Sequence, residues 1–121
     1  MTFENKYDKQ ATLEASKKKH SIKMYLHSYT NENNPMTSSK IQKVFHCSDV
    51  VVRKAVGLLR DDGEPIGSGS KGFFYARSPK QLEGTIMHLK SRIGALSGRL
   101  KALEATYGRI GGNEPQQMLD L

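Results

Sequence analysis

The sequence predicts a mainly α-helical protein with one small β-hairpin and a long C-terminal helix. Apolar residues recur at helical spacing in short segments before residue 60, and short apolar runs flank a glycine-rich turn at residues 65–75. From Leu82 onward the apolar residues alternate in steps of four and three. At 121 residues the chain has room for one compact domain and an additional helix, but not for two full cores.

The composition is basic and gives no membrane signal. The chain carries 19 Lys+Arg against 12 Asp+Glu, a formal net charge of +7 and a pI near 9.6, which favours polyanionic partners. It has no run of about 18 or more apolar residues, and its first residues, MTFENKYDKQ, lack the apolar stretch of a signal peptide. We therefore expect a cytoplasmic protein with no membrane partner.

Catalytic and metal chemistry have little support in the sequence. The single cysteine, Cys47, excludes an internal disulfide and a multi-thiolate metal site, and the four histidines show no i,i+4 pairing. No nucleophile–base constellation or phosphate loop is present, because the glycine-rich run at residues 67–72 lacks the strand-to-helix context of a nucleotide-binding loop. The chain is predicted to have no metal, no cofactor and no enzymatic activity.

The N-terminal part is predicted to hold one helix. Residues 1–16 are mixed and polar, and we interpret them as a flexible arm or a poorly fixed helix. Between Ser21 and Tyr29, apolar residues at i, i+3, i+4 and i+7 form one helical face. The polar segment TNENNP, residues 30–35, is a loop by composition, since Pro35 prevents the helix from continuing.

Two short helices and a hairpin are predicted next. The first helix spans residues 38–45 with Thr37 or Ser38 as its N-cap, and Ser48 caps a second helix that ends near Gly63. Strands at residues 65–67 and 73–75 then flank a turn at residues 68–72. The long helix that follows is predicted to start at Ser78, with Pro79 at its first position, and to run to residue 110.

This order of elements is that of a winged helix-turn-helix. The segment VFHCSDVVVRKAV resembles the helix-turn-helix pattern, and LLRDDGEPIGSGSKGFFYA is similar to the wing of biotin operon repressor-type winged helices. The resemblance covers about residues 21–77 and implies a DNA-binding domain over residues 17–77. His46 stands where that family usually has glycine. No biotin-ligase domain follows, so ligase activity is not implied, and the layout is similar to small winged-helix proteins of bacteriophages and mobile elements.

The first turns of the second short helix are the predicted base-reading surface. Arg53 suits guanine O6 and N7, Asp49 can accept from cytosine N4, and Val50 or Val51 can meet a thymine methyl group. Seven further residues suit the phosphate backbone: Lys40, Lys43, Ser48, Lys54, Ser68, Ser70 and Lys71. The alternative is that Arg53 and Lys54 only solvate an exposed helix face.

The C-terminal helix carries a predicted dimerisation seam. Its apolar residues fall at heptad positions a and d: Leu82, Ile86, Leu89, Ile93, Leu96, Leu100, Leu103, Tyr107 and Ile110. β-Branched residues at two of the four a positions, Ile86 and Ile93, with mainly Leu at d favour two parallel strands, in which Arg99 faces Glu104 of the partner subunit. The alternative is that the helix folds back on its own domain. Residues 111–121 are interpreted as a disordered tail, or as a short partner-docking peptide.

Together these features predict a sequence-specific, nucleoid-associated binder of double-stranded DNA that acts as a homodimer. It would be a phage or bacterial transcriptional regulator, or an accessory of replication or recombination. The alternative function is a protein-interaction adaptor that uses the winged-helix fold and the coiled coil to bind a host or phage protein.

Overall fold

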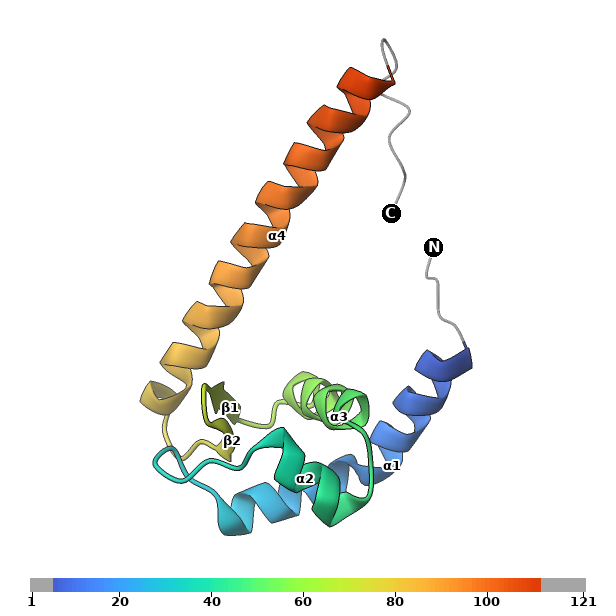
Figure 1. The fold of residues 1–121 in the computed structure, drawn as a ribbon. Helices are drawn as coiled ribbons and strands as arrows, with labels where there is room; N and C mark the ends of the chain where they lie inside the picture. Colours follow the sequence, from blue (N-terminus) through green and yellow to red (C-terminus); the bar gives the residue numbers. More distant parts are fainter. Residues whose placement is uncertain (1–5, 112–121) are drawn as a thin grey trace. The chain divides into compact units, whose positions relative to one another are not determined.

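The computed structural model describes residues 6–111. Helices α1 (Lys6–Tyr29), α2 (Ser38–Phe45) and α3 (Asp49–Asp61) precede strands β1 (Ile66–Gly69) and β2 (Gly72–Tyr75); a 3₁₀ turn, η1 (Pro79–Leu82), leads into α4 (Glu83–Ile110) (Figure 1). The protein is thus mainly helical, with one antiparallel hairpin and a long C-terminal helix, as the sequence predicts. None of these helices is long and apolar enough to cross a membrane.

The described residues form two compact units, and the boundary between them lies between Thr85 and Ile86. The first unit contains α1, α2, α3, the hairpin and η1, and its core lies largely between α1 and α3. α1 contributes Ala15, Ile22 and Leu26, which share one helix face and are fully buried. Five apolar side chains of α3 are also buried: Val51, Val52, Ala55, Val56 and Leu59. The first unit also includes the first three residues of α4, and the second unit contains the rest of this helix, from Ile86 onward.

α1 is longer than the sequence predicts. It begins at Lys6, whereas the sequence prediction made residues 1–16 an arm or a poorly fixed helix and began the apolar face at Ser21. Ala15 is 0% exposed and Ala11 packs against the core, so this face extends two turns further toward the N-terminus. Alanine buries little apolar area, and its periodicity is correspondingly weak in the sequence. Residues 1–5 lie outside the described part of the chain.

Two lysines of α1 hold the C-terminal ends of the next two helices. Lys18 Nζ donates to the backbone oxygen of Phe45, the last residue of α2, over 3.1 Å. Lys19 Nζ donates to Asp62 Oδ2 over 2.7 Å at the end of α3. A cation beside unpaired C-terminal carbonyls also complements the helix dipole. α1 therefore fixes α2 and α3 by charge as well as by apolar packing.

The hairpin is joined by a shorter turn than the sequence predicts. Gly69 pairs with Gly72, so only Ser70 and Lys71 connect the strands, in place of the predicted turn at residues 68–72. On the outer side of β2, Met36 and Phe73 exchange two backbone hydrogen bonds of 2.8 Å each. This bridge attaches the hairpin to the segment that precedes α2.

The long C-terminal helix starts later than predicted. Pro79 occupies the first turn as expected, but residues 79–82 form the 3₁₀ turn η1, and Ser78 makes no side-chain capping bond. Leu82 therefore lies outside α4, and the predicted seam begins within the helix at Ile86. Residues 112–121, which the sequence prediction assigns to the C-terminal tail, lie outside the described part of the chain.

Candidate nucleic-acid interface

A tight turn joins α2 to α3. α2 spans Ser38–Phe45 and is capped by the Thr37 side chain, which confirms its predicted bounds. His46 then adopts the left-handed conformation, with φ 51° and ψ 53°, and its N–H donates to the Gln42 carbonyl. Left-handed residues are uncommon outside glycine, although histidine is enriched among the exceptions. His46 thus takes the backbone conformation that a glycine would otherwise supply.

The residues after His46 fix the start of α3. Ser48 Oγ accepts from Val51 N over 3.2 Å, which confirms Ser48 as the N-cap of this helix. Cys47 is partly buried against the core, and this burial raises the pKa of its thiol. A raised pKa keeps the thiol protonated and unreactive. Cys47 therefore acts as a small packing residue in the turn.

α3 presents one narrow exposed face beside its buried one. Val50 is 51% exposed, the Arg53 side chain is 65% exposed, and a Cβ added at Gly57 would meet no atom within 4 Å. Steps of three and four residues place these positions on the same side of the helix. Lys54 is partly buried at the edge of this face. The outward surface of α3 is therefore an arginine between a valine and a glycine.

Val51 is wrongly predicted as a base contact. Its side chain is 2% exposed and belongs to the core, so it cannot reach a ligand. α1, α2 and β1 all pack against α3, and its buried face includes Val51 as well as Val52. Of the two valines offered for a thymine methyl, only Val50 is accessible.

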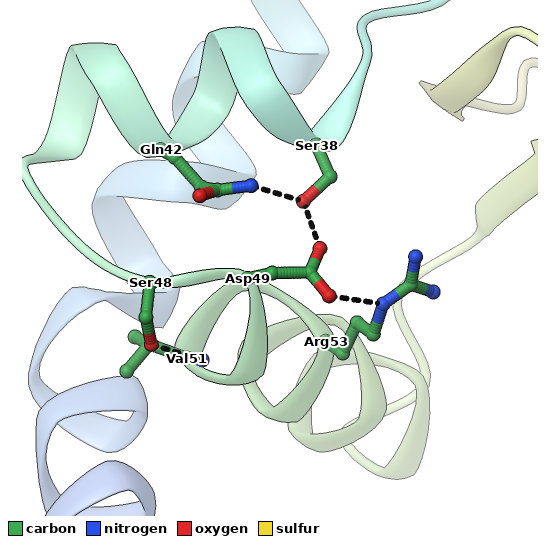
Figure 2. Close-up of polar contacts among 6 residues, drawn as sticks. All are labelled: Ser38, Gln42, Ser48, Asp49, Val51 and Arg53. Atoms are coloured by element: carbon green, nitrogen blue, oxygen red, sulfur yellow. Dashed lines mark hydrogen bonds and ion pairs between the residues drawn. The ribbon is translucent and has the colours of Figure 1, made fainter.

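A chain of polar contacts joins α2 to the exposed face of α3 (Figure 2). Gln42 Nε2 donates to Ser38 Oγ over 3.1 Å, and Ser38 Oγ donates to Asp49 Oδ1 over 2.5 Å. Arg53 Nε donates to Asp49 Oδ2 over 2.8 Å. Both carboxylate oxygens of Asp49 are therefore bonded within the protein. The bond from Ser38, followed by that from Arg53, lowers the pKa of Asp49, so this carboxylate is ionised at neutral pH.

The hairpin offers two exposed polar residues at its tip. Ser70 and Lys71 form the two-residue connection and are exposed, as their predicted role requires. Ser68 differs, because Thr85 Oγ1 bonds to both its backbone N (3.0 Å) and its backbone O (3.2 Å). The Ser68 hydroxyl also accepts from Arg60 Nη2 over 3.1 Å. Ser68 is therefore bonded to Arg60 and Thr85 inside the protein, and it links the hairpin to α3 and α4.

Arg60 connects the end of α3 to the hairpin. Its Nε donates to the Ile66 carbonyl over 2.9 Å, in addition to the bond from Nη2 to Ser68. Burial lowers the pKa of the guanidinium, but arginine stays charged in proteins. Arg60 thus links β1 to the end of α3 through two hydrogen bonds.

Further predicted phosphate contacts lie on the surface of the same unit. Lys40 and Lys43 are exposed on α2, and Ser48 is exposed at the start of α3. The Ser48 oxygen accepts the capping bond, yet a hydroxyl can still donate to a phosphate. The first unit therefore carries every predicted DNA contact, although Val51 is buried and Ser68 is bonded inward.

Four residues of this region are absent from the sequence prediction as functional or supporting groups. Ser38 and Gln42 hold Asp49, while Arg60 and Thr85 hold the hairpin. The i,i+4 spacing of Asp49 and Arg53 is a readable signal for an ion pair. Gln42 and Ser38 are likewise four residues apart on α2, whereas the contacts of Ser38 with Asp49, of Arg60 with Ser68 and of Ser68 with Thr85 join residues of different elements, and no local pattern indicates them.

α4 exposes a long apolar stripe. Thr85 is its only buried residue, and the predicted seam side chains from Ile86 to Ile110 are all more than a third exposed; Ile93 and Leu103 reach 67% and 68%. Contiguous apolar surface of this extent is typical of an interaction site. Glycines 84, 94 and 98 lie away from the a and d positions, so they do not interrupt the stripe.

Comparison with protein-family models, with curated proteins and with solved structures finds no match for this chain. Within residues 6–111, no three His, Cys, Asp or Glu side chains are grouped so that they could hold a metal ion.

Proposed function

We propose that the first unit is a winged helix-turn-helix and that the protein binds double-stranded DNA sequence-specifically as a homodimer. In this assignment α3 is the recognition helix and the β1–β2 hairpin is the wing. The biological role would be that of a phage or bacterial transcriptional regulator, or of a replication or recombination accessory. No catalytic step is part of the proposal.

The outward face of α3 is the observation that carries this proposal. An α-helix fits the major groove of B-DNA, and the N-terminal part of a recognition helix meets the base edges. Val50 and Arg53 are exposed in that part of α3, directly after its Ser48 cap. Gly57 adds no side chain that would hold the helix away from the groove.

Charge supports the same assignment. The net charge of +7 favours association with a polyanion. Lys40 and Lys43 on α2 and Lys71 at the hairpin tip are exposed, where they can contact phosphates on either side of the groove that holds α3.

The apolar stripe of α4 supports a homodimer. Steps of four and three residues sustained from Ile86 to Ile110 match the seam of a two-stranded coiled coil. A dimer links two recognition helices, and its natural target is a pair of half-sites, often about 34 Å apart.

The flanking charges favour a parallel arrangement. In a parallel pair, Arg99 at g faces Glu104 at e of the partner subunit, and Arg92 faces a serine. In an antiparallel pair that keeps the seam from Ile86 to Ile110 in register, Lys90 would face Glu104 of the partner subunit, but the two Arg99 side chains would face each other, and like charges repel.

The same exposed stripe favours the second candidate function, a protein-interaction adaptor. An apolar helix face can also pair with a helix of a different protein. The adaptor predicts no duplex affinity, together with capture of a defined protein partner through α4.

Selection from a randomised duplex pool tests the proposal. The full chain is incubated with the pool at two salt concentrations, and the bound duplexes are sequenced. A paired motif with fixed spacing is expected. Retention without a motif, lost steeply with salt, would indicate phosphate-only binding. No retention at either salt concentration would favour the adaptor.

Lys71→Ala tests the role of the hairpin tip. Because a phosphate contact carries no sequence information, the variant should weaken binding to all duplexes alike. The slope of log K against log salt should fall in magnitude by about 1. The measurement is a salt titration of binding by fluorescence anisotropy, with Lys71→Arg as the charge-preserving control. An unchanged slope for Lys71→Ala would exclude this phosphate contact.

A further inference from the structure

The three guanidinium nitrogens of Arg53 differ in their bonding. Nε is bonded to Asp49 Oδ2, whereas neither terminal nitrogen has a partner among residues 6–111. The other arginine of α3, Arg60, bonds inward through both Nε and Nη2. Figure 2 shows the Arg53 guanidinium extending outward beyond Asp49, with its two terminal nitrogens at the end. Arg53 therefore presents a pair of donors at a fixed place on the helix surface.

Asp49, at the start of α3, holds the Arg53 guanidinium in this position, and Asp49 is itself held by Ser38 of α2. Its second oxygen accepts from Ser38, and Ser38 in turn accepts from Gln42, so the carboxylate is held across the interface of two helices. An arginine on an exposed helix face is otherwise free to sample many rotamers. The network restricts Arg53 before any ligand binds, and preorganisation of this kind improves recognition by lowering the ordering cost.

Two parallel donors match one base in the major groove. Guanine presents O6 and N7 as adjacent acceptors, and the two ends of a guanidinium can bond to both. Adenine places a donor beside N7, and cytosine and thymine each lack the paired acceptors.

We propose that Asp49 is a positioning residue that holds Arg53 so that its two terminal nitrogens read O6 and N7 of one guanine in each half-site. This inference rests on the proposed function. It replaces the sequence prediction that Asp49 itself accepts from cytosine N4, since its bonded oxygens face Ser38 and Arg53.

Base analogues in the selected duplex test the inference. Each guanine is replaced in turn by 7-deazaguanine, which lacks the N7 acceptor, or by inosine, which keeps O6 and N7 and loses only a minor-groove amine. At one guanine per half-site, 7-deazaguanine should weaken wild-type binding about tenfold, while inosine changes it less than twofold. With Arg53→Ala, the same 7-deazaguanine duplex should bind as well as the unmodified one.

Asp49→Ala separates positioning from plain electrostatics, because alanine removes both the charge and the acceptor for Arg53 Nε. Removing a negative charge near DNA strengthens binding to every duplex if charge alone matters. Loss of positioning instead weakens binding to the selected site about fivefold and reduces the penalty of 7-deazaguanine. Asp61→Ala is the matched control, because it removes the same charge from an exposed position at the other end of α3. Ser38→Ala leaves Asp49 in place but removes its support, and should shift the 7-deazaguanine penalty in the same direction.

The outcomes separate this inference from the proposed function. Absence of any duplex binding would overturn both. A selected motif that is insensitive to 7-deazaguanine at all guanines would overturn guanine reading by Arg53 and leave DNA binding intact. Uniformly stronger binding by Asp49→Ala, with the 7-deazaguanine penalty unchanged, would overturn the positioning role of Asp49.

Discussion

Leu96→Asp should convert the protein to a monomer and reduce its affinity for a paired site by about 10²–10⁴-fold. Leu96 lies at a d position in the middle of the apolar stripe and is 58% exposed in the single chain. In a coiled coil that position is buried, and an aspartate there would lose its hydration without gaining a partner. Affinity for a single half-site should be unchanged, because α3 and the hairpin are untouched.

Sedimentation equilibrium and binding to duplexes with one or two half-sites measure this effect. Ser91→Asp is the matched control, since it introduces the same charge at an f position on the opposite side of α4. The control should remain a dimer with full paired-site affinity. A wild-type protein that is monomeric at micromolar concentration, or a Leu96→Asp variant that is still dimeric, would exclude α4 as the self-association surface.

Gly72→Ala should lower the stability of the first unit by about 3 kcal/mol. Gly72 has φ +128°, a backbone conformation that alanine rarely adopts, and an added Cβ would overlap the backbone oxygen of Met36. Relief of the overlap requires the two Met36–Phe73 hydrogen bonds to lengthen or break. The expected loss combines backbone strain with the weakening of these bonds.

Thermal unfolding followed by circular dichroism tests this prediction, with an expected decrease in Tm of about 10–20 °C. Gly69→Ala is the matched control at the opposite hairpin position, where a Cβ meets no atom within 4 Å and φ is not positive. It should leave stability unchanged or raise it by up to about 1 kcal/mol, because alanine restricts the unfolded chain. Equal melting temperatures for the two variants would contradict this account of Gly72.

The parts of the fold that were predicted correctly depend on local chemistry. Ser48 is recognisable as a cap because its side chain satisfies an amide three residues away, and the start of α2 follows in the same way from Thr37. Gly63 was predicted to end α3, and it does so with φ +90°. Glu64 N then bonds to the Leu59 carbonyl, which completes the helix C-cap.

The parts that were missed depend on contacts between distant segments. Nothing near Ala15 in the sequence shows that it is buried in the core, and nothing near Val51 shows how wide the buried face of α3 is. The pairing of Ser38 with Asp49 and of Ser68 with Thr85 likewise follows only from the packed structure. For the candidate site, the exposure of Val50 and Arg53 and the spacing of the Asp49–Arg53 pair are readable from the sequence, whereas the burial of Val51 and the support of Asp49 by Ser38 are not.

The hairpin has a further consequence for how the chain can assemble. Both of its edges are occupied in the middle: Thr85 takes the backbone N and O of Ser68 on β1, and Met36 takes those of Phe73 on β2. Unpaired strand edges are templates for strand addition and aggregation. With these groups occupied, the small sheet cannot recruit another strand there without first breaking bonds of its own. The proposed homodimer would therefore gain nothing from the sheet edges, and its contact surface would be the exposed apolar stripe of α4.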